Sequence, residues 1–166
     1  GSVGALKAMG ALDMGLTEAE LKPLVDAWRD ANPNIVGLWA DVEDAAIQAI
    51  TTRAKINLHC LSFAVRSGIL FITLPSGRTL AYVQPTLGEN RWGGTSINYW
   101  GVGTNKKWQK LETYGGKLVE NIVQAIARDL LTHSLSVLDR AGHKVVMHVH
   151  DEAVIEEACA SSATVE

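Results

Sequence analysis

The residues best suited to chemistry stand together in the segment KVVMHVHDEAVIEE, residues 144–157. His150, Asp151 and Glu152 separate two apolar runs that favour burial. Because an unpaired carboxylate is costly to desolvate, these groups need either water or a positive charge beside them. Proteins bind Mg²⁺ with one or two carboxylates plus substrate phosphates, so this acidic turn is a candidate cation site. The alternative is an ordinary polar turn at a solvent-exposed hairpin tip.

A second metal hypothesis uses the histidines of the same segment. His148 and His150 form an H-x-H pair, a spacing found in some zinc hydrolases. No further ligand set follows at a recognisable spacing, so we expect His148 to be a hydrogen-bonded histidine that faces inward or toward a sheet. A metal-dependent hydrolase that uses His148, His150 and Asp151 therefore stays an alternative.

A stripe of polar residues precedes this segment on a strongly apolar stretch. Its members are spaced four, three and four residues apart: Lys117, Asn121, Gln124 and Arg128. This spacing keeps them within one narrow arc of an α-helix. Amide and basic side chains donate hydrogen bonds to phosphate oxygens and to acceptors on the groove edges of DNA. The solvent-exposed face of a packed helix has the same pattern, so both interpretations stay open.

The charges are divided unevenly along the chain, although the net charge is only −3. Residues 51–117 hold nine basic and two acidic residues, whereas each flanking segment holds three basic and eight acidic ones. A basic middle segment is expected where phosphates bind, and a solvated surface with a chance excess explains it equally well. Trp92, Trp100 and Trp108 fall in this segment, where they would stack on nucleobases or pack on a sheet.

The composition is that of a soluble globular protein. The hydrophobic fraction is 47%, the charged fraction is 20%, and 166 residues suffice for one domain with a core. No apolar run is long enough to cross a membrane, and no signal or transit peptide is visible. Cys60 and Cys159 form neither a disulfide framework nor a metal-binding spacing. We therefore expect a reducing, cytoplasmic location and no membrane partner.

Helices are expected to dominate the first third of the chain. A Gly-interrupted helix is expected over 2–14. The capping box Thr17-Glu18-Ala19-Glu20 starts a second helix, which ends before Asn32-Pro33. A third helix follows from about Asn34, with apolar residues at helical spacing as far as Ile50.

Strand patterns follow, and then one more helix and a hairpin. The run ILFITLPSGRTLAYVQP predicts two strands around Pro75-Ser76-Gly77-Arg78, and INYWGVG and KKWQKLE predict further strands. A long helix is expected over 113–141, closed by Gly142, before a hairpin at 144–157. These elements predict an α+β fold. We divide it into a helical segment, 1–50, and a segment with the sheet, the long helix and the final hairpin, 51–166.

The order of these motifs resembles that of family A DNA polymerases, the bacterial polymerase I type, and of phage-type members above all. VMHVHDEAVIEE resembles the palm hairpin of that family. YGGKLVENIVQAIARDLL resembles the helix just upstream, with a Gln and a later Asp at the same spacing. LPSGRTLAYVQP resembles the Gly-Arg strand pair, and residues 1–39 resemble the fingers segment after the nucleotide-binding helix. The resemblance covers nearly the whole chain in the right order.

The resemblance implies roles for individual residues. Asp151 would be a ligand of two catalytic Mg²⁺ ions, with Glu152 beside it as the more dispensable carboxylate. His150 would touch the primer end, and Gln124 would contact the minor groove near the primer terminus. The remaining expected DNA contacts are Arg78 of the Gly-Arg strand pair and, inferred from the helix stripe, Lys117, Asn121 and Arg128.

The resemblance also implies that parts of the polymerase site lie outside this chain. The first palm Asp and the nucleotide-binding helix would both precede Gly1. A single carboxylate cluster does not hold two Mg²⁺ ions ~3.5–4 Å apart, so we expect the isolated chain to be inactive. The expected partners are primer–template DNA, dNTPs and the rest of the polymerase chain, and an exposed core face would favour self-association. A non-catalytic nucleic-acid-binding module stays open as a third hypothesis.

Overall fold

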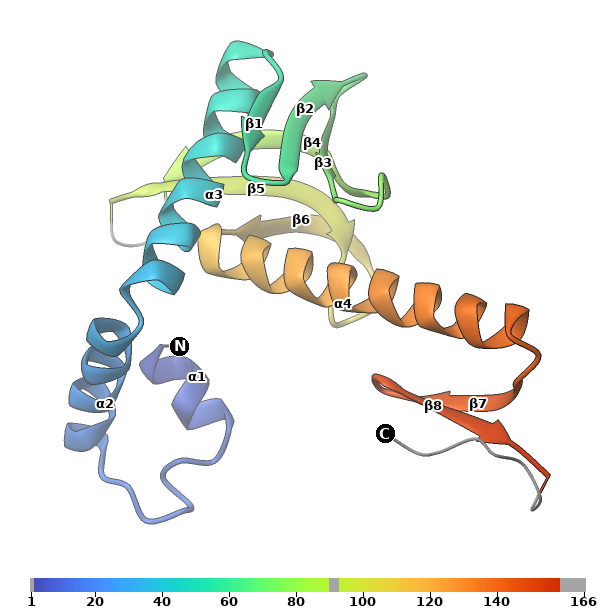
Figure 1. The fold of residues 1–166 in the computed structure, drawn as a ribbon. Coiled ribbons are helices and arrows are strands. Elements are labelled where there is room, and N and C mark those ends of the chain that lie inside the picture. The colour runs from blue at the N-terminus through green and yellow to red at the C-terminus, as the bar shows by residue number, and fades with distance from the viewer. Residues whose placement is uncertain (1, 90–92, 159–166) are drawn as a thin grey trace.

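Residues 2–89 and 93–158 of the chain are described by a computed structural model. They form helices and two antiparallel sheets, which confirms the expected α+β class (Figure 1). The elements in chain order are α1 Val3–Ala8, α2 Glu18–Ala31, α3 Pro33–Thr52, β1 Ile56–Leu58, β2 Leu61–Arg66, β3 Ile69–Thr73, β4 Thr79–Glu89, β5 Thr95–Val102, β6 Trp108–Thr113, α4 Gly115–Arg140, β7 Lys144–Val149 and β8 Glu152–Glu156. None of the described helices is long and apolar enough to span a membrane.

Helix α2 begins at its predicted capping box, whereas α1 is shorter than expected. The Glu20 carboxylate closes the predicted capping box by accepting hydrogen bonds from the Thr17 hydroxyl at 2.7 Å and the Thr17 backbone N–H at 2.8 Å. These two bonds hold the pKa of Glu20 below its usual value. The helix expected over 2–14 is wrong in its extent. It ends at Ala8, because Gly10 adopts a left-handed φ of 83° that a helix does not accommodate.

A six-stranded antiparallel sheet forms the body of the molecule, in the order β1-β2-β3-β4-β5-β6. Residues 74–78 join β3 to β4, which confirms the predicted hairpin. The predicted strands in INYWGVG and KKWQKLE are β5 and β6, which pair with each other. The pairing of β4 with β5 shifts register between Val83 and Thr86, a bulge that bends β4.

Helices α3 and α4 pack on one side of this sheet and close the core (Figure 1). The buried cluster takes side chains from both helices and the sheet, including Val42, Ala46, Phe63, Leu70, Ile72, Ile97, Leu118 and Ile122. The two helices approach closely at Gly115, where an added Cβ would lie 1.9 Å from the Trp39 backbone oxygen. Glycine is therefore required at the start of α4 for this packing.

Helix α4 joins this body to the C-terminal hairpin. Its buried residues end at Leu131, and the rest of the helix extends past the sheet (Figure 1). It ends at Arg140, and Gly142 follows with a left-handed φ of 88°, which confirms the predicted long helix and its glycine stop. Strands β7 and β8 fold back beneath the C-terminal half of α4 as a separate two-stranded sheet, the hairpin predicted at 144–157 (Figure 1).

Candidate functional site

The turn of the C-terminal hairpin consists of His150 and Asp151, and Glu152 is the first residue of β8. Val149 pairs with Glu152 across this turn, which fixes all three ionisable residues at the tip. His150 has a φ of 52°, in the left-handed region that tight hairpin turns use. All three residues are exposed, so the structure presents the predicted catalytic groups to solvent together.

The two carboxylates of the tip have no positive partner in the described part of the chain. Neither takes part in an ion pair or a side-chain hydrogen bond within residues 2–89 and 93–158. At the opposite end of the hairpin, by contrast, Lys144 pairs with Glu156, and His143 Nδ1 lies 2.6 Å from Glu157 Oε1. The carboxylates at the open end of the hairpin therefore have nitrogen partners, whereas those of the tip form an uncompensated negative charge within the described ranges.

The donor groups at the tip fit one part of a divalent-cation site. Carboxylate oxygens are the ligands that Mg²⁺ prefers, and Asp151 and Glu152 are consecutive exposed residues at the tip. No group of three or more His, Cys, Asp or Glu side chains within the described ranges is arranged to hold a metal ion, so further ligands would have to come from elsewhere. His148, His150 and Asp151 thus do not form the three-ligand group that the hydrolase hypothesis requires.

The polar stripe of α4 holds the other predicted site residues. Lys117, Gln124 and Arg128 are exposed and accessible to an external ligand. The Gln124 Nε2 donates a long 3.4 Å hydrogen bond to Glu120 Oε1 on the preceding turn. Asn121 is different, because its Nδ2 donates to the Tyr82 hydroxyl at 3.1 Å and so ties α4 to β4. The amide of Asn121 is therefore partly committed to the fold, whereas the rest of the stripe faces solvent.

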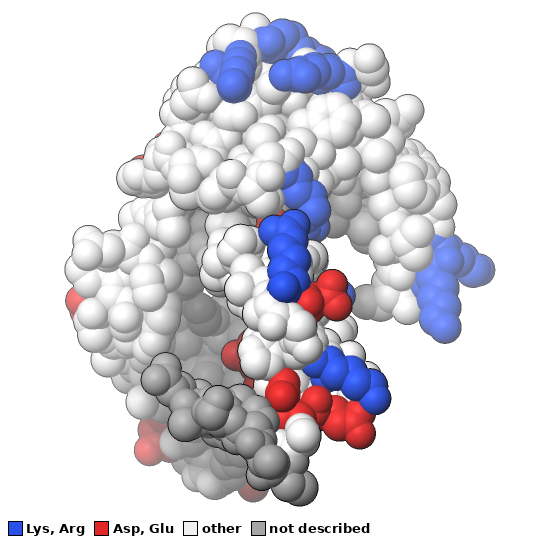
Figure 2. Space-filling view, turned by 45° about the vertical axis from the view of Figure 1, so that its right-hand side comes forward, with Lys and Arg blue, Asp and Glu red and all other residues white. Residues whose placement is uncertain are grey.

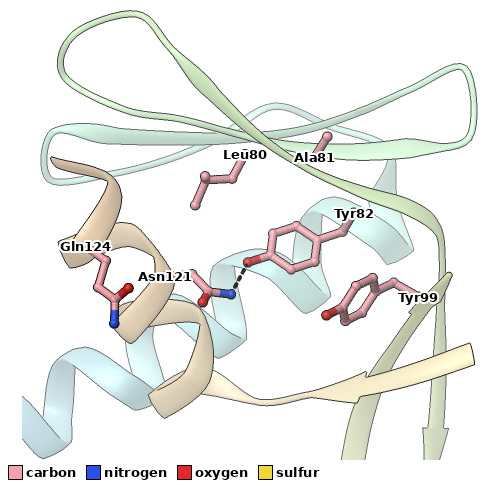
Figure 3. A pocket seen from close by; sticks show the side chains of 6 residues that line it. All are labelled: Leu80, Ala81, Tyr82, Tyr99, Asn121 and Gln124. Atoms are coloured by element: carbon pink, nitrogen blue, oxygen red, sulfur yellow. Dashed lines mark hydrogen bonds between the residues drawn. The ribbon is translucent and has the colours of Figure 1, made fainter. Parts of the chain in front are cut away.

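Asn121 and Gln124 line a shallow pocket of about 330 Å³ between α4 and strands β4 and β5, together with Leu80, Ala81, Tyr82 and Tyr99 (Figure 3). The two tyrosine rings meet edge to face, with centroids 5.0 Å apart and planes at 81°. Burial raises the pKa of Tyr82, an effect that the Asn121 hydrogen bond opposes. The Tyr82 hydroxyl thus stays protonated at neutral pH. The pocket consequently combines two amides and a hydroxyl with an aromatic wall.

Arg78 is bound to α4 through two hydrogen bonds. Its Nε donates to Asp129 Oδ1 at 2.6 Å, and its Nη2 donates to the Ala125 carbonyl at 2.7 Å. Ser76 of the same loop donates its hydroxyl to Asp129 Oδ2 at 2.6 Å. The Ser76 hydrogen bond, reinforced by Arg78, holds the pKa of Asp129 below its usual value. We call this arrangement the Arg78–Asp129 clamp; a DNA contact by Arg78 stays a prediction beside it.

Lysine and arginine side chains stand in separate groups on the face shown in Figure 2, and some of them lie beside acidic side chains. The basic excess of residues 51–117 therefore does not form one continuous stripe in this view. Arg91, Trp92 and Cys159 lie outside the described residues. Trp100 and Trp108 are both exposed.

Sequence reasoning missed two residues that shape the pocket, Tyr82 and Tyr99. Tyr82 is buried and lies two residues after the half-buried Leu80 on the same face of β4, and this spacing carried a signal for it. Tyr99 is half-buried like its neighbour Asn98, so the pattern of β5 did not single it out. Asp129 was noticed only through its spacing from Gln124, and the clamp that it forms was not foreseen.

Comparison with known proteins places the chain beside a phage polymerase. It is 57% identical over 158 residues, 94% of its length, to a DNA polymerase of Bacillus phage SP02, and it spans 24% of the length of that protein. No family model matches the chain, and no solved structure gives a significant match. The expected resemblance to a phage DNA polymerase is thereby confirmed, whereas its assignment to family A stays a prediction.

Proposed function

We propose that this chain is the segment of a family A DNA polymerase that carries the acidic palm hairpin and the helix beside the primer terminus. The observation that carries the proposal is the high identity, along almost the entire chain, to the SP02 phage polymerase. The geometry agrees with it, because the groups that such an enzyme needs are exposed at the hairpin tip and along α4.

In this proposal Asp151 and Glu152 hold Mg²⁺ together with a carboxylate from the rest of the polymerase chain. When bound, the two ions would activate the primer 3′-hydroxyl and stabilise the charge of the pyrophosphate leaving group. Asp151 is the principal ligand and Glu152 assists it. The uncompensated charge of the tip supports this assignment, because two adjacent carboxylates without a basic partner are stabilised by a cation.

The same proposal assigns DNA contacts to the turn and to α4. His150 meets the primer end, and the Gln124 amide donates to acceptors in the minor groove near the primer terminus. Lys117 and Arg128 are exposed on α4, where they would meet backbone phosphates. The substrates are accordingly primer–template DNA and a dNTP.

The chain alone is expected not to extend a primer. The hairpin tip supplies adjacent carboxylates from one turn, whereas two ions ~3.5–4 Å apart need a further ligand placed opposite them. Without that ligand, the positioning and charge neutralisation that dominate phosphoryl transfer are lost.

The test is single-nucleotide extension of a labelled primer–template with Mg²⁺ by a chimeric polymerase. In the chimera this chain replaces the matching 158-residue segment of the SP02 polymerase. We expect the chimera to extend the primer and the isolated chain to be inactive. Asp151→Asn in the chimera should lower the rate by at least roughly 100-fold, because it removes charge stabilisation at the reacting phosphate.

Asp139→Asn is the matched control, since Asp139 is an exposed carboxylate near the end of α4 and away from the turn. It should extend the primer at the rate of the parent chimera. Equal rates for Asp151→Asn and Asp139→Asn would show that the tip is only a polar turn. A chimera that binds primer–template but does not extend it would contradict the proposed polymerase function itself.

A further inference from the structure

The face of the six-stranded sheet that points away from α3 and α4 carries two exposed tryptophans. Trp100 on β5 is 38% exposed and Trp108 on β6 is 58% exposed, although tryptophan is highly buried on average. Val102, the cross-strand partner of Trp108, is 64% exposed. Exposed apolar groups that cluster within a polar surface mark binding sites.

The strand register places these side chains together. Trp100 pairs with Lys110, and Val102 pairs with Trp108, two positions further along the same ladder. Paired residues point to the same side of a sheet, and so does every second residue of a strand, so these four side chains share one face. Trp100 and Trp108 are diagonal neighbours, about 7–8 Å apart. Ile97 points to the opposite side and is fully buried in the core.

The same face continues across the sheet from one cation, Lys110, to a second, Arg66. Trp100 pairs with Val83 of β4, Val83 with Ile69 of β3, and Ile69 with Arg66 of β2. Val83 and Ile69 are half-buried, whereas Arg66 and Lys110 at the two ends are exposed. An aromatic and aliphatic row therefore runs between two positive charges.

Two further lysines adjoin the tryptophans. Lys106 and Lys107 lie in the turn between β5 and β6, directly before Trp108, and both are exposed. Glu112 is an acidic residue of the same face, where it pairs with Asn98. With Arg66 and Lys110, these lysines give the face four cations against the one carboxylate of Glu112, so the face is positive and complements a phosphate backbone.

We propose that this outer face of β5 and β6 binds single-stranded DNA, with bases stacked on Trp100 and Trp108. The phosphates would be held by the surrounding cations Arg66, Lys106, Lys107 and Lys110. Aromatic platforms beside a positive surface bind single strands without sequence preference, because every base has a face to stack and only unpaired bases expose it. The lysines disfavour a protein partner here, since lysine is depleted from protein–protein interfaces.

This site goes beyond the proposed function, because it lies on the opposite side of the sheet from α4. It would hold an unpaired strand rather than the primer terminus. Its test measures no catalysis, so its failure and the failure of the polymerase proposal are distinguishable.

The test is fluorescence anisotropy of a labelled oligodeoxythymidine titrated with the whole chain at low ionic strength. Trp108→Ala should weaken binding about fivefold or more, the loss expected for one stacked base. Trp28→Ala is the matched control, because Trp28 is a 41% exposed tryptophan on α2, and it should bind like the wild type. Lys110→Gln should reduce the slope of log K against log salt concentration by about 0.7, whereas Trp108→Ala should leave that slope unchanged.

Circular dichroism establishes that each variant is folded. If Trp108→Ala does not fold, Lys110→Gln decides the matter, since an exposed lysine is not needed for packing. Failure of the wild-type chain to bind the oligonucleotide, or equal affinities for Trp108→Ala and Trp28→Ala, would overturn the proposal. Equal competition by a duplex of the same length would also overturn it, because the face would then bind phosphates without stacking.

Discussion

The six-stranded sheet with α3 and α4 and the hairpin of β7 and β8 are stabilised in different ways. The sheet and helices enclose fully buried side chains such as Phe63, Leu70 and Ile72, whereas no residue of either hairpin strand is buried. A two-stranded hairpin is only marginally stable by itself in water. The predicted catalytic residues therefore lie on the loosely packed hairpin, which contacts the well-packed region through α4.

The largest loss of stability is expected in the well-packed region, where α3 and α4 cross. Gly115→Ala would place a Cβ 1.9 Å from the Trp39 backbone oxygen, and backbone moves only at a cost. We expect a loss of roughly 1–3 kcal/mol in the free energy of unfolding, or more. Urea unfolding followed by circular dichroism measures it.

Gly37→Ala is the matched control for this prediction. Gly37 lies inside α3, and an added Cβ there would meet no atom within 4 Å. The change should stabilise the helix by roughly 0.5–1 kcal/mol. If both substitutions stabilised the protein, the close approach of α4 to α3 would not exist in solution.

An intermediate effect, dependent on pH, is expected at the Arg78–Asp129 clamp. The pKa of Asp129 is lowered in the folded protein, mainly by the Ser76 hydroxyl, so the clamp contributes stability above the unfolded pKa of about 3.8. That contribution is lost as the pH falls through the lower folded pKa. Asp129→Asn should therefore melt a few degrees below the wild type at pH 7, and the gap should shrink towards pH 3.

Ser76→Ala sharpens the same measurement. It removes the Ser76 hydrogen bond, the largest cause of the lowered pKa of Asp129, but keeps the Arg78–Asp129 ion pair. The melting curve of Ser76→Ala should therefore lie between those of the wild type and Asp129→Asn. A gap between Asp129→Asn and the wild type that stays constant from pH 7 to pH 3 would exclude the carboxylate as its source.

The features that the sequence predicted correctly are those with local signals. The Thr17–Glu20 capping box, the loop at 74–78 and the glycine stop at Gly142 each depend on a few neighbouring residues. Strands β1 and β2 were missed. β1 has only three residues, and it is specified by its pairing with β2 rather than by a pattern of its own. The first helix, by contrast, was predicted too long, because its apolar pattern continues past Gly10, where the backbone leaves the helical conformation.

The residues of the candidate site also divide into those with a local sequence signal and those whose contacts depend on tertiary packing. The acidic tip could be placed from sequence, because a turn sets its own residues side by side. The Tyr82–Asn121 and Arg78–Asp129 contacts join residues 39 and 51 positions apart, so they depend on how α4 packs on the sheet. Spacing along a helix shows which residues share a face, and it does not show what that face meets.

The smallest effect on stability is expected at Asp151, although its effect on catalysis should be the largest. Asp151 is exposed and has no partner in the described ranges, and it stands next to the like charge of Glu152. Asp151→Asn should therefore change the free energy of unfolding by less than about 0.5 kcal/mol, as surface substitutions usually do. Urea unfolding of the chain and primer extension by the chimera measure the two effects separately. The two measurements together separate a structural role of Asp151 from a catalytic one.

If Asp151→Asn instead destabilised the chain as much as Gly115→Ala, the carboxylate would be supporting the hairpin, and a loss of extension would no longer argue for metal binding. An unchanged unfolding curve together with abolished extension would place the contribution of Asp151 in catalysis alone, as the uncompensated charge of the tip leads us to expect.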